Sequence, residues 1–317
     1  MDKLIGRHKE QLILKNCLES GRSELVVIYG RRRIGKTFLV RRFFNDTYDF
    51  SFVGKHDMPR EQQLADFAKT LQRYSSSEFT PELKNWTQAF DGLAKLLEAK
   101  DTSRKKVIFF DEMPWMDTPK SDFVSSLENF WNGWAAMRDD IVFVACGSAT
   151  SWMIDSLLHN QGGLFNRITR KIYLRPFRLY EVEQYMDEHH FNWSRYQIAQ
   201  CYMILGGVPF YLTLLNPHMS LLSNIDELIF ADSHAMLRTE HNELYATPFK
   251  RPDNYLTVIR HLTQRKEGYT RKEISEQTGL GGAALTKILS DLEQCDFVLP
   301  YARYGNKCNN TIYRIKD

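Results

Sequence analysis

The stretch VVIYGRRRIGKTFLVRRFF, from Val26 to Phe44, joins three different kinds of sequence. Four apolar residues, 25–28, run without a polar interruption. Such a run is typical of a parallel strand covered on both faces, and we expect this strand to span residues 24–29. A turn with two glycines and three arginines follows, and then a segment with helical periodicity. Small residues and positive charge at the end of a buried strand favour a bound anion at that place.

The turn matches the pattern of a phosphate-binding loop. Gly30 is followed, after four residues, by Gly35, Lys36 and Thr37. At this spacing small residues let backbone N–H groups surround phosphate at a helix N-terminus. The lysine would reach the β- and γ-phosphates of ATP, and the Thr37 hydroxyl would bind Mg²⁺. The residues expected to contact the nucleotide are Gly30, Arg31, Arg32, Arg33, Ile34, Gly35, Lys36, Thr37 and Phe38.

The three arginines of the loop are less specific than its lysine. We expect at least two of them to face solvent. For the third, contact with the nucleotide and contact with a neighbouring subunit both stay open.

A second buried strand, at residues 107–110, ends in two acids, Asp111 and Glu112. Asp111 is expected to hold Mg²⁺ through its water shell, and Glu112 to orient and deprotonate the attacking water as general base. Adjacent acids at a strand end also occur as solvated caps. The phosphate-binding loop earlier in the chain favours the catalytic interpretation.

A third strand is expected at residues 141–145, and Ser148 follows it closely. Its hydroxyl would contact the γ-phosphate or the attacking water, or it would cap the next helix. Arg167 precedes a further strand expected at residues 171–174. It is either an arginine finger that neutralises transition-state charge, within the subunit or across an interface, or an ordinary surface arginine.

Six segments together resemble one protein family: LIGRHKEQL, YGRRRIGKT, DEMPW, CGSAT, LRPF and GGVPFYL. They are similar to bacterial and archaeal ATPases of the AAA+/STAND class. The resemblance implies an α/β fold of the P-loop NTPase type, with a parallel sheet core, a helical lid and a C-terminal winged-helix domain. It also implies that Ile5, Gly6 and Arg7 lie beside the adenine and ribose, and that the lid segment ending in Pro209 contacts the nucleotide. Turn chemistry alone would also account for Gly6 and for residues 206–209.

Two departures from the family pattern modify this picture. The segment FYLTLLNPHMSLL after Pro209 has no arginine, so the second sensor of motor-type relatives is not visible and we expect a slow switch instead of a motor. Relatives often continue into a nuclease-like domain, and because the sequence stops at TIYRIKD we expect this domain to be missing. Whether Asp317 is the natural end stays open.

Periodicity and turn residues predict the domain organisation. We expect a P-loop core at residues 1–177, a helical lid at 178–233, a connecting segment at 234–253 and a winged-helix domain at 254–317. Within the core, a short strand is expected at 50–55 and helices at 60–74 and 81–98. In the last domain, helices are expected at 255–262, from Thr270, and at 283–292, followed by a hairpin of strands at 297–304 and 311–315.

Composition excludes several classes of protein. The 317 residues are 43% hydrophobic with a net charge of +3, which suits globular domains without a global attraction to nucleic acid or membrane. Five scattered cysteines without metal-ligand spacing favour reduced thiols. No apolar run has the length of a signal peptide core or a membrane span. We therefore expect a cytoplasmic protein that has no membrane partner.

The expected recognition helix of the winged-helix domain, residues 282–294, is poorly suited to reading DNA. Lys287 is its one base, against Asp291 and Glu293. We expect weak binding of DNA without sequence preference, or a protein partner. The bases most available to phosphate are Lys287, Arg303, Lys307, Arg314 and Lys316.

Taken together, the motifs favour an enzyme that binds MgATP and hydrolyses it slowly as a conformational or assembly switch. The alternative is a winged-helix interaction or DNA-binding module that holds nucleotide with little or no hydrolysis. The expected partners are ATP and ADP, with a homo-oligomer if Arg167 acts on a neighbouring site.

Overall fold

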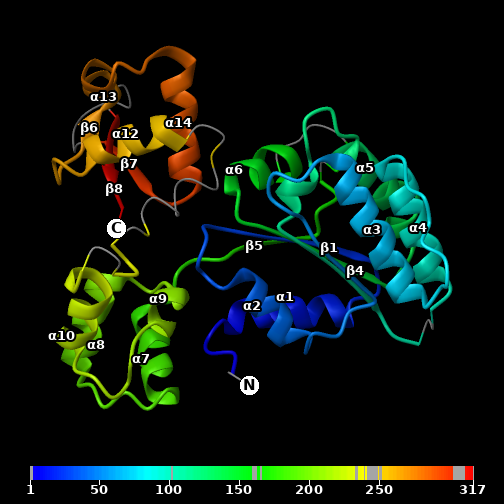
Figure 1. The fold of residues 1–317 in the computed structure, drawn as a ribbon, viewed down its shortest axis with the longest axis horizontal. Coiled ribbons are helices and arrows are strands. Elements are labelled where there is room, and N and C mark those ends of the chain that lie inside the picture. The colour runs from blue at the N-terminus through cyan, green and yellow to red at the C-terminus, as the bar shows by residue number, and fades with distance from the viewer. Residues whose placement is uncertain are drawn as a thin grey trace. The chain divides into compact units, whose positions relative to one another are not determined.

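The structure is a computed structural model (Figure 1) that describes residues 3–100, 103–158, 163–164, 166–232, 235–238, 240, 249, 252–302 and 311–316. The chain divides into two compact units. The first comprises the residues up to Tyr29, Gly35–Ser148 and Trp152–Leu174. The second comprises Gly30–Ile34, Ala149–Ser151 and the residues from Arg175 onward.

A parallel sheet of five strands forms the centre of the first unit. The strand order is β2-β3-β4-β1-β5, and every neighbouring pair is parallel. The strands are β1 (Glu24–Tyr29), β2 (Phe50–Val53), β3 (Lys106–Asp111), β4 (Ile141–Gly147) and β5 (Arg170–Tyr173). All five predicted strands are present, with some differences in their bounds: the strand expected at 50–55 ends at Val53, the one expected at 141–145 extends to Gly147, and the one expected at 171–174 ends at Tyr173. The three central strands are buried almost throughout, because apolar side chains fill both of their faces.

The register aligns the ends of the three central strands. Tyr29, the last residue of β1, pairs with Gly147, the last residue of β4. Phe110, near the end of β3, pairs with Ala145 of β4. The segments that follow these strands therefore emerge at the same edge of the sheet.

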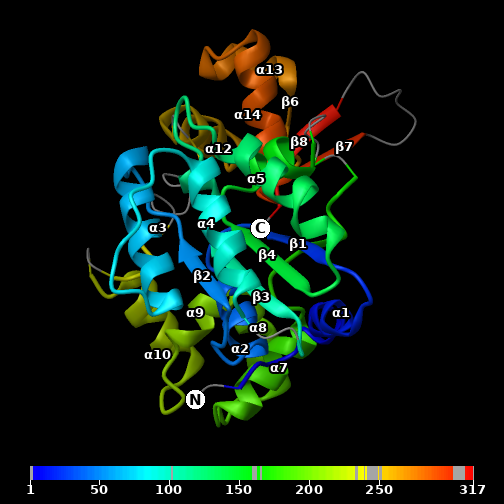
Figure 2. The ribbon, with the colours of Figure 1, turned by 90° about the vertical axis from the view of Figure 1, so that its right-hand side faces the viewer.

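Helices cover both faces of the sheet. Figure 1 shows α1 and α2 on one side and α3, α4 and α5 on the other, and Figure 2 views the sheet from the side of α3 and α4. On that side an aromatic core includes Phe50, Phe67, Trp86, Phe90 and Phe110. The helices of this unit are α1 (His8–Glu19), α2 (Lys36–Phe43), α3 (Arg60–Ser75), α4 (Trp86–Glu98), η1 (Met113–Met116), α5 (Phe123–Gly133), η2 (Ala135–Met137) and the π-helix η3 (Met153–Leu158). The short helix α6 (Thr150–Trp152) precedes η3, and its first two residues are assigned to the second unit.

The start of one predicted helix is wrong. The helix expected at 81–98 begins at Trp86, because the Asn85 side chain accepts a hydrogen bond of 2.9 Å from the Gln88 backbone N–H. This N-cap has extended backbone dihedrals and cannot itself be helical.

The second unit contains a group of helices at residues 179–230. They are α7 (Leu179–Glu188), α8 (Arg195–Leu205), α9 (Pro209–Thr213), α10 (Leu221–Ile225) and the π-helix η4 (Asp226–Phe230). Gly206 ends α8 with a φ of 63°, and Pro209 is the first residue of α9. Most of the predicted connecting segment, 234–253, lies outside the described residues.

The second unit also contains a winged-helix arrangement. Its elements are α12 (Pro252–Leu262), β6 (Tyr269–Thr270), α13 (Arg271–Thr278), α14 (Gly282–Gln294), β7 (Val298–Ala302) and β8 (Thr311–Ile315). The strands form an antiparallel sheet in the order β6-β8-β7, and Thr270 caps α13 as predicted. Leu285, Ile288, Leu289 and Leu292 of α14 are buried against α12 and α13. Arg303 and Lys307 lie outside the described residues.

In the described part of the chain, every helix is too short or too polar to cross a membrane.

Candidate active site

The phosphate-binding loop joins β1 to α2, and its backbone takes unusual dihedrals. The φ angles are 141° at Gly30, 69° at Arg33 and 83° at Gly35. Glycine adopts these values without the steric cost of a Cβ, which explains the two glycines of the pattern. Gly35 is the N-cap of α2, so the loop leads directly into the N-terminal turn, whose first N–H groups have no intrahelical acceptor. This geometry suits an anion.

Lys36 and Thr37 open α2 beside the end of β3. Lys36 is only 6% exposed. The Thr37 Oγ1 donates a hydrogen bond of 2.8 Å to Oδ2 of Asp111, which is also buried. Burial raises the pKa of the Asp111 carboxyl, and the hydrogen bond from Thr37 opposes that rise. The two residues predicted to hold magnesium are therefore in contact.

The pair fits Mg²⁺ in its chemistry. A hydroxyl and a carboxylate are hard oxygen donors, and Mg²⁺ is commonly held by one or two protein oxygens together with phosphates and water. Within the described ranges there is no cluster of three or more His, Cys, Asp or Glu side chains suited to a metal. An ion at this place would therefore take further ligands from a bound nucleotide and from water.

Glu112 and Ser148 form a second contact at the same edge of the sheet. Ser148 Oγ donates to Glu112 Oε2 over 2.7 Å, and the Ser148 backbone N–H lies 3.3 Å from the same oxygen. Glu112 has φ 46° and ψ 41°, a left-handed conformation that is uncommon for glutamate. The sequence did not predict that the serine would contact the acid. The contact arises because β4 lies next to β3 in the sheet.

Residues 5–7 form a tight turn ahead of α1. Gly6 and Arg7 have φ values of 59° and 57°, and Gln11 Nε2 donates to the Gly6 carbonyl over 2.7 Å. Ile5 and Arg7 are buried. The turn accounts for the glycine, and its role beside adenine stays a prediction.

Arg33 lies against α9 in the second unit. Its guanidinium makes two hydrogen bonds to Glu240, of 2.9 and 3.2 Å, and lies 4.0 Å from the centre of the Phe210 ring. The Phe210 N–H, next to Pro209, donates to the Arg33 carbonyl over 3.2 Å. The pairing with Glu240 spans 207 positions, so no local pattern could have predicted it. Arg31 and Arg32 are half-buried.

The remaining predicted residues lie in different environments. Ile34 is buried, whereas Phe38 is exposed on α2 with the Arg42 guanidinium 5.1 Å from its ring centre. Arg167 is exposed, and its backbone N–H donates to the Leu164 carbonyl over 3.0 Å. An exposed side chain is compatible with both interpretations of Arg167.

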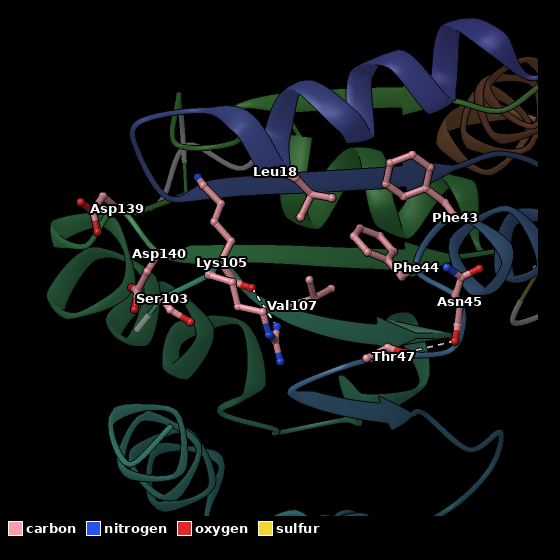
Figure 3. Close-up of a pocket in the computed structure, with 11 residues that line it drawn as sticks. Leu18, Phe43, Phe44, Asn45, Thr47, Ser103, Lys105, Val107, Asp139 and Asp140 are labelled. Atoms are coloured by element: carbon pink, nitrogen blue, oxygen red, sulfur yellow. Dashed lines mark hydrogen bonds between the residues drawn. The ribbon is translucent and has the colours of Figure 1, made fainter. Parts of the chain in front are cut away.

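A cavity of about 680 Å³ lies at the opposite end of α2, near the start of β3 (Figure 3). Phe43, Phe44 and Val107 form part of its wall. The basic residues Arg104 and Lys105 already have partners: Arg104 pairs with Asp49 at 2.8 Å, and Lys105 Nζ donates to Ser20 Oγ over 2.9 Å. We therefore do not assign phosphate binding to this cavity.

The loop after β1, the buried lysine and the two acids at the end of β3 are the features of a P-loop ATPase fold. Residues 4–215 match the model of a family described as an ATPase domain predominantly from Archaea. The chain belongs to this family. The predicted resemblance to a family of P-loop ATPases and the predicted fold class are both confirmed.

An uncharacterized protein of Methanocaldococcus jannaschii is 23% identical over 300 residues, which cover 93% of this chain and 61% of that protein. The chain therefore spans less than two thirds of the length of that relative. Among solved structures, the Walker-type ATPase of Pyrococcus abyssi has a TM-score of 0.65 at 18% identity, covering 99% of this chain and 94% of that one. The ORC2 protein of Aeropyrum pernix, in ADPNP–ADP complexes, has a TM-score of 0.57 at 14% identity and covers 99% and 90%.

Proposed function

We propose that this nucleotide-dependent ATPase binds MgATP and hydrolyses it slowly as a conformational or assembly switch, with the winged-helix domain as its output. The observation that carries the proposal is the pair of contacts at one sheet edge, Thr37 with Asp111 and Ser148 with Glu112. The first pair suits magnesium, and the second supports a role for the Glu112 carboxylate in activating water.

Each residue then has a defined task. Thr37 and Asp111 would hold the magnesium ion, which neutralises charge on the β- and γ-phosphates. The Lys36 ammonium, held in a buried position, would add positive charge at the same phosphates. Ser148 orients the Glu112 carboxylate through Oε2, and we assign Oε1 to accept the proton of the attacking water.

The slow rate rests on the sequence after Pro209. Residues 209–221, which include α9, contain no arginine or lysine that could neutralise transition-state charge from the lid side. The same feature favours the second candidate, a nucleotide-holding interaction module with little hydrolysis. Arg167 would supply the missing charge from a neighbouring subunit if the protein acts as an oligomer.

Phosphate release separates the two candidates. Wild-type protein should release phosphate from MgATP, and Glu112→Gln should reduce turnover by about a hundredfold or more because the general base is lost. The variant should still show an ATP-induced rise in melting temperature, which Lys36→Ala should abolish. Equal turnover in wild type and Glu112→Gln would contradict the enzyme proposal and favour the second candidate, the nucleotide-holding interaction module.

The trans role of Arg167 has its own test. Mixing Lys36→Ala with Arg167→Ala subunits should restore part of the activity if one interface can combine an intact loop with an intact arginine. No recovery at concentrations where subunits exchange would contradict the trans role.

A further inference from the structure

The buried side-chain amide of Gln63, on α3, connects two segments of the chain. One is the loop after β2, which contains Lys55, and the other is the segment after β3, which contains Glu112 and Trp115. These two segments are called the two loops below. Gln63 is 0% exposed. Its Nε2 donates to the Lys55 carbonyl over 2.9 Å and to the Trp115 carbonyl over 2.8 Å, and its Oε1 accepts from the Lys55 N–H at 3.4 Å. Two carbonyl acceptors on one side fix which end of the amide is nitrogen.

The two loops continue β2 and β3, and they also contact each other directly. The Gly54 N–H donates to the Asp111 carbonyl over 2.9 Å. A Cβ at Gly54 would lie only 2.4 Å from the Glu112 carbonyl oxygen, so the backbones are packed as closely as glycine allows. The Trp115 N–H in turn donates to the Glu112 carbonyl over 3.1 Å. Glu112 therefore sits inside a closed set of backbone hydrogen bonds that Gln63 completes.

Glu112 needs such support because its backbone is left-handed, at φ 46°. A residue held in this region persists only where its surroundings over-determine the conformation. The direction of the Glu112 side chain depends on that backbone. A rotation there would move the carboxylate away from the water that it should activate.

We propose that Gln63 is a positioning residue for the hydrolysis step, acting on Glu112 through the backbones of both loops. This inference rests on the proposed function. Gln63 is far along the chain from every motif of the site, and it touches neither Lys36, Thr37 nor Asp111 among its hydrogen bonds. Its loss should therefore slow the chemical step and leave ATP binding intact.

The site requires an amide specifically. Two donors and one acceptor are used together, a set that methionine, glutamate and leucine lack. Gln63→Met keeps the approximate length and shape of the side chain and removes every hydrogen bond. It leaves the Lys55 and Trp115 carbonyls unsatisfied, so the loops are free to shift.

The experiment measures kcat, KM and the ATP-induced shift in melting temperature. We expect Gln63→Met to lower kcat by about tenfold to a hundredfold, because small displacements of catalytic groups have such effects, with KM and the shift unchanged. Thr70→Val is the matched control. Thr70 is a buried residue on the same helix whose hydroxyl donates to the Asp66 carbonyl of that helix at 2.8 Å, and this variant should keep the wild-type kcat.

A double variant tests whether the effect passes through Glu112. In a Glu112→Gln background, measured with protein in excess over labelled ATP, Gln63→Met should cause no further loss beyond about twofold. A merely structural role would reduce the residual rate by the same factor in both backgrounds. If Gln63→Met does not fold, the same measurements are made with Gln63→Asn, which keeps the amide on a shorter side chain. The expected loss of kcat is then smaller.

The outcomes separate the two proposals. If Glu112→Gln is inactive but Gln63→Met turns over at the wild-type rate, or loses ATP binding together with kcat, the positioning role is overturned and the ATPase proposal stands. If wild-type protein turns over no faster than Lys36→Ala, the ATPase proposal and the role of Gln63 both fail.

Discussion

Ser148→Ala should slow ATP turnover about tenfold and leave ATP binding unchanged. The Ser148 hydroxyl donates to Glu112 Oε2 over 2.7 Å from a buried position. A hydrogen bond to a charged group contributes about 1.5–3 kcal/mol. The lower end applies here, because Glu112 is half-buried and the Ser148 N–H, 3.3 Å from the same oxygen, remains in the variant. A loss of about 1.4 kcal/mol in the transition state corresponds to a factor of ten in rate.

The assay follows phosphate release over a range of ATP concentrations and, separately, the melting temperature with and without MgATP. If the hydroxyl acts on Glu112, kcat should fall alone. If it contacted the γ-phosphate, ATP binding would weaken as well. Ser126→Ala provides the control, since Ser126 is also buried and its hydroxyl bonds to Thr87 Oγ1 at 2.9 Å and donates to Asp122 Oδ2 at 3.5 Å instead of to Glu112.

Three results would refute the reasoning. The first is a kcat for Ser148→Ala equal to that of the wild type and of Ser126→Ala. The second is a rise in KM with a smaller ATP-induced shift in melting temperature. The third is a full tenfold loss that persists in a Glu112→Gln background, because the serine would then act independently of the acid.

Three further predictions concern stability and the output domain. Asp140→Asn should destabilise the protein by about 3 kcal/mol or more, because Lys106, 1% exposed, loses the carboxylate 2.7 Å away. The hydrogen bonds from Arg138 and then Lys106 hold the pKa of Asp140 below its usual range. The wild type should therefore lose the stabilisation contributed by the ionised Asp140 as pH falls below ~4. The melting temperature of Asp140→Asn should depend less on pH in that range. Gly207→Ala should lower the free energy of unfolding, measured by chemical denaturation, by about 1–3 kcal/mol, because the new Cβ would lie 1.8 Å from the Phe177 carbonyl oxygen. Gly21→Ala is the control and should be neutral, because a Cβ at this position would have no atom within 4 Å. Fluorescence anisotropy should show that the protein binds duplex DNA weakly, without sequence preference and with a shallow salt dependence, because Lys287 of α14 is paired with Asp291 at 2.8 Å. A nanomolar, sequence-selective complex at physiological salt would contradict this prediction.

The sequence by itself determined the local parts of the site. The loop from Gly30 to Thr37 could be predicted because a phosphate-binding turn is specified by glycine positions and by its place between a strand and a helix, all within eight residues. The strands were predictable for a similar reason, since a short, uninterrupted apolar run such as Val107–Phe110 is typical of a strand buried on both faces of a parallel sheet. The acids Asp111 and Glu112 follow from that strand directly.

The partners of those residues were decided by the tertiary structure alone. Ser148 contacts Glu112 across 36 positions, Gln63 contacts Trp115 across 52, and Arg33 pairs with Glu240 across 207. Apolar periodicity identifies a strand but carries no information on its neighbours in the sheet. Only the order β2-β3-β4-β1-β5 places Ser148 beside Glu112 and brings the loop after β2 against the loop after β3. The residue types of the candidate site can thus be predicted from local sequence, whereas the orientation of the Glu112 carboxylate depends on strand order and register, which are set by the packing of the whole sheet.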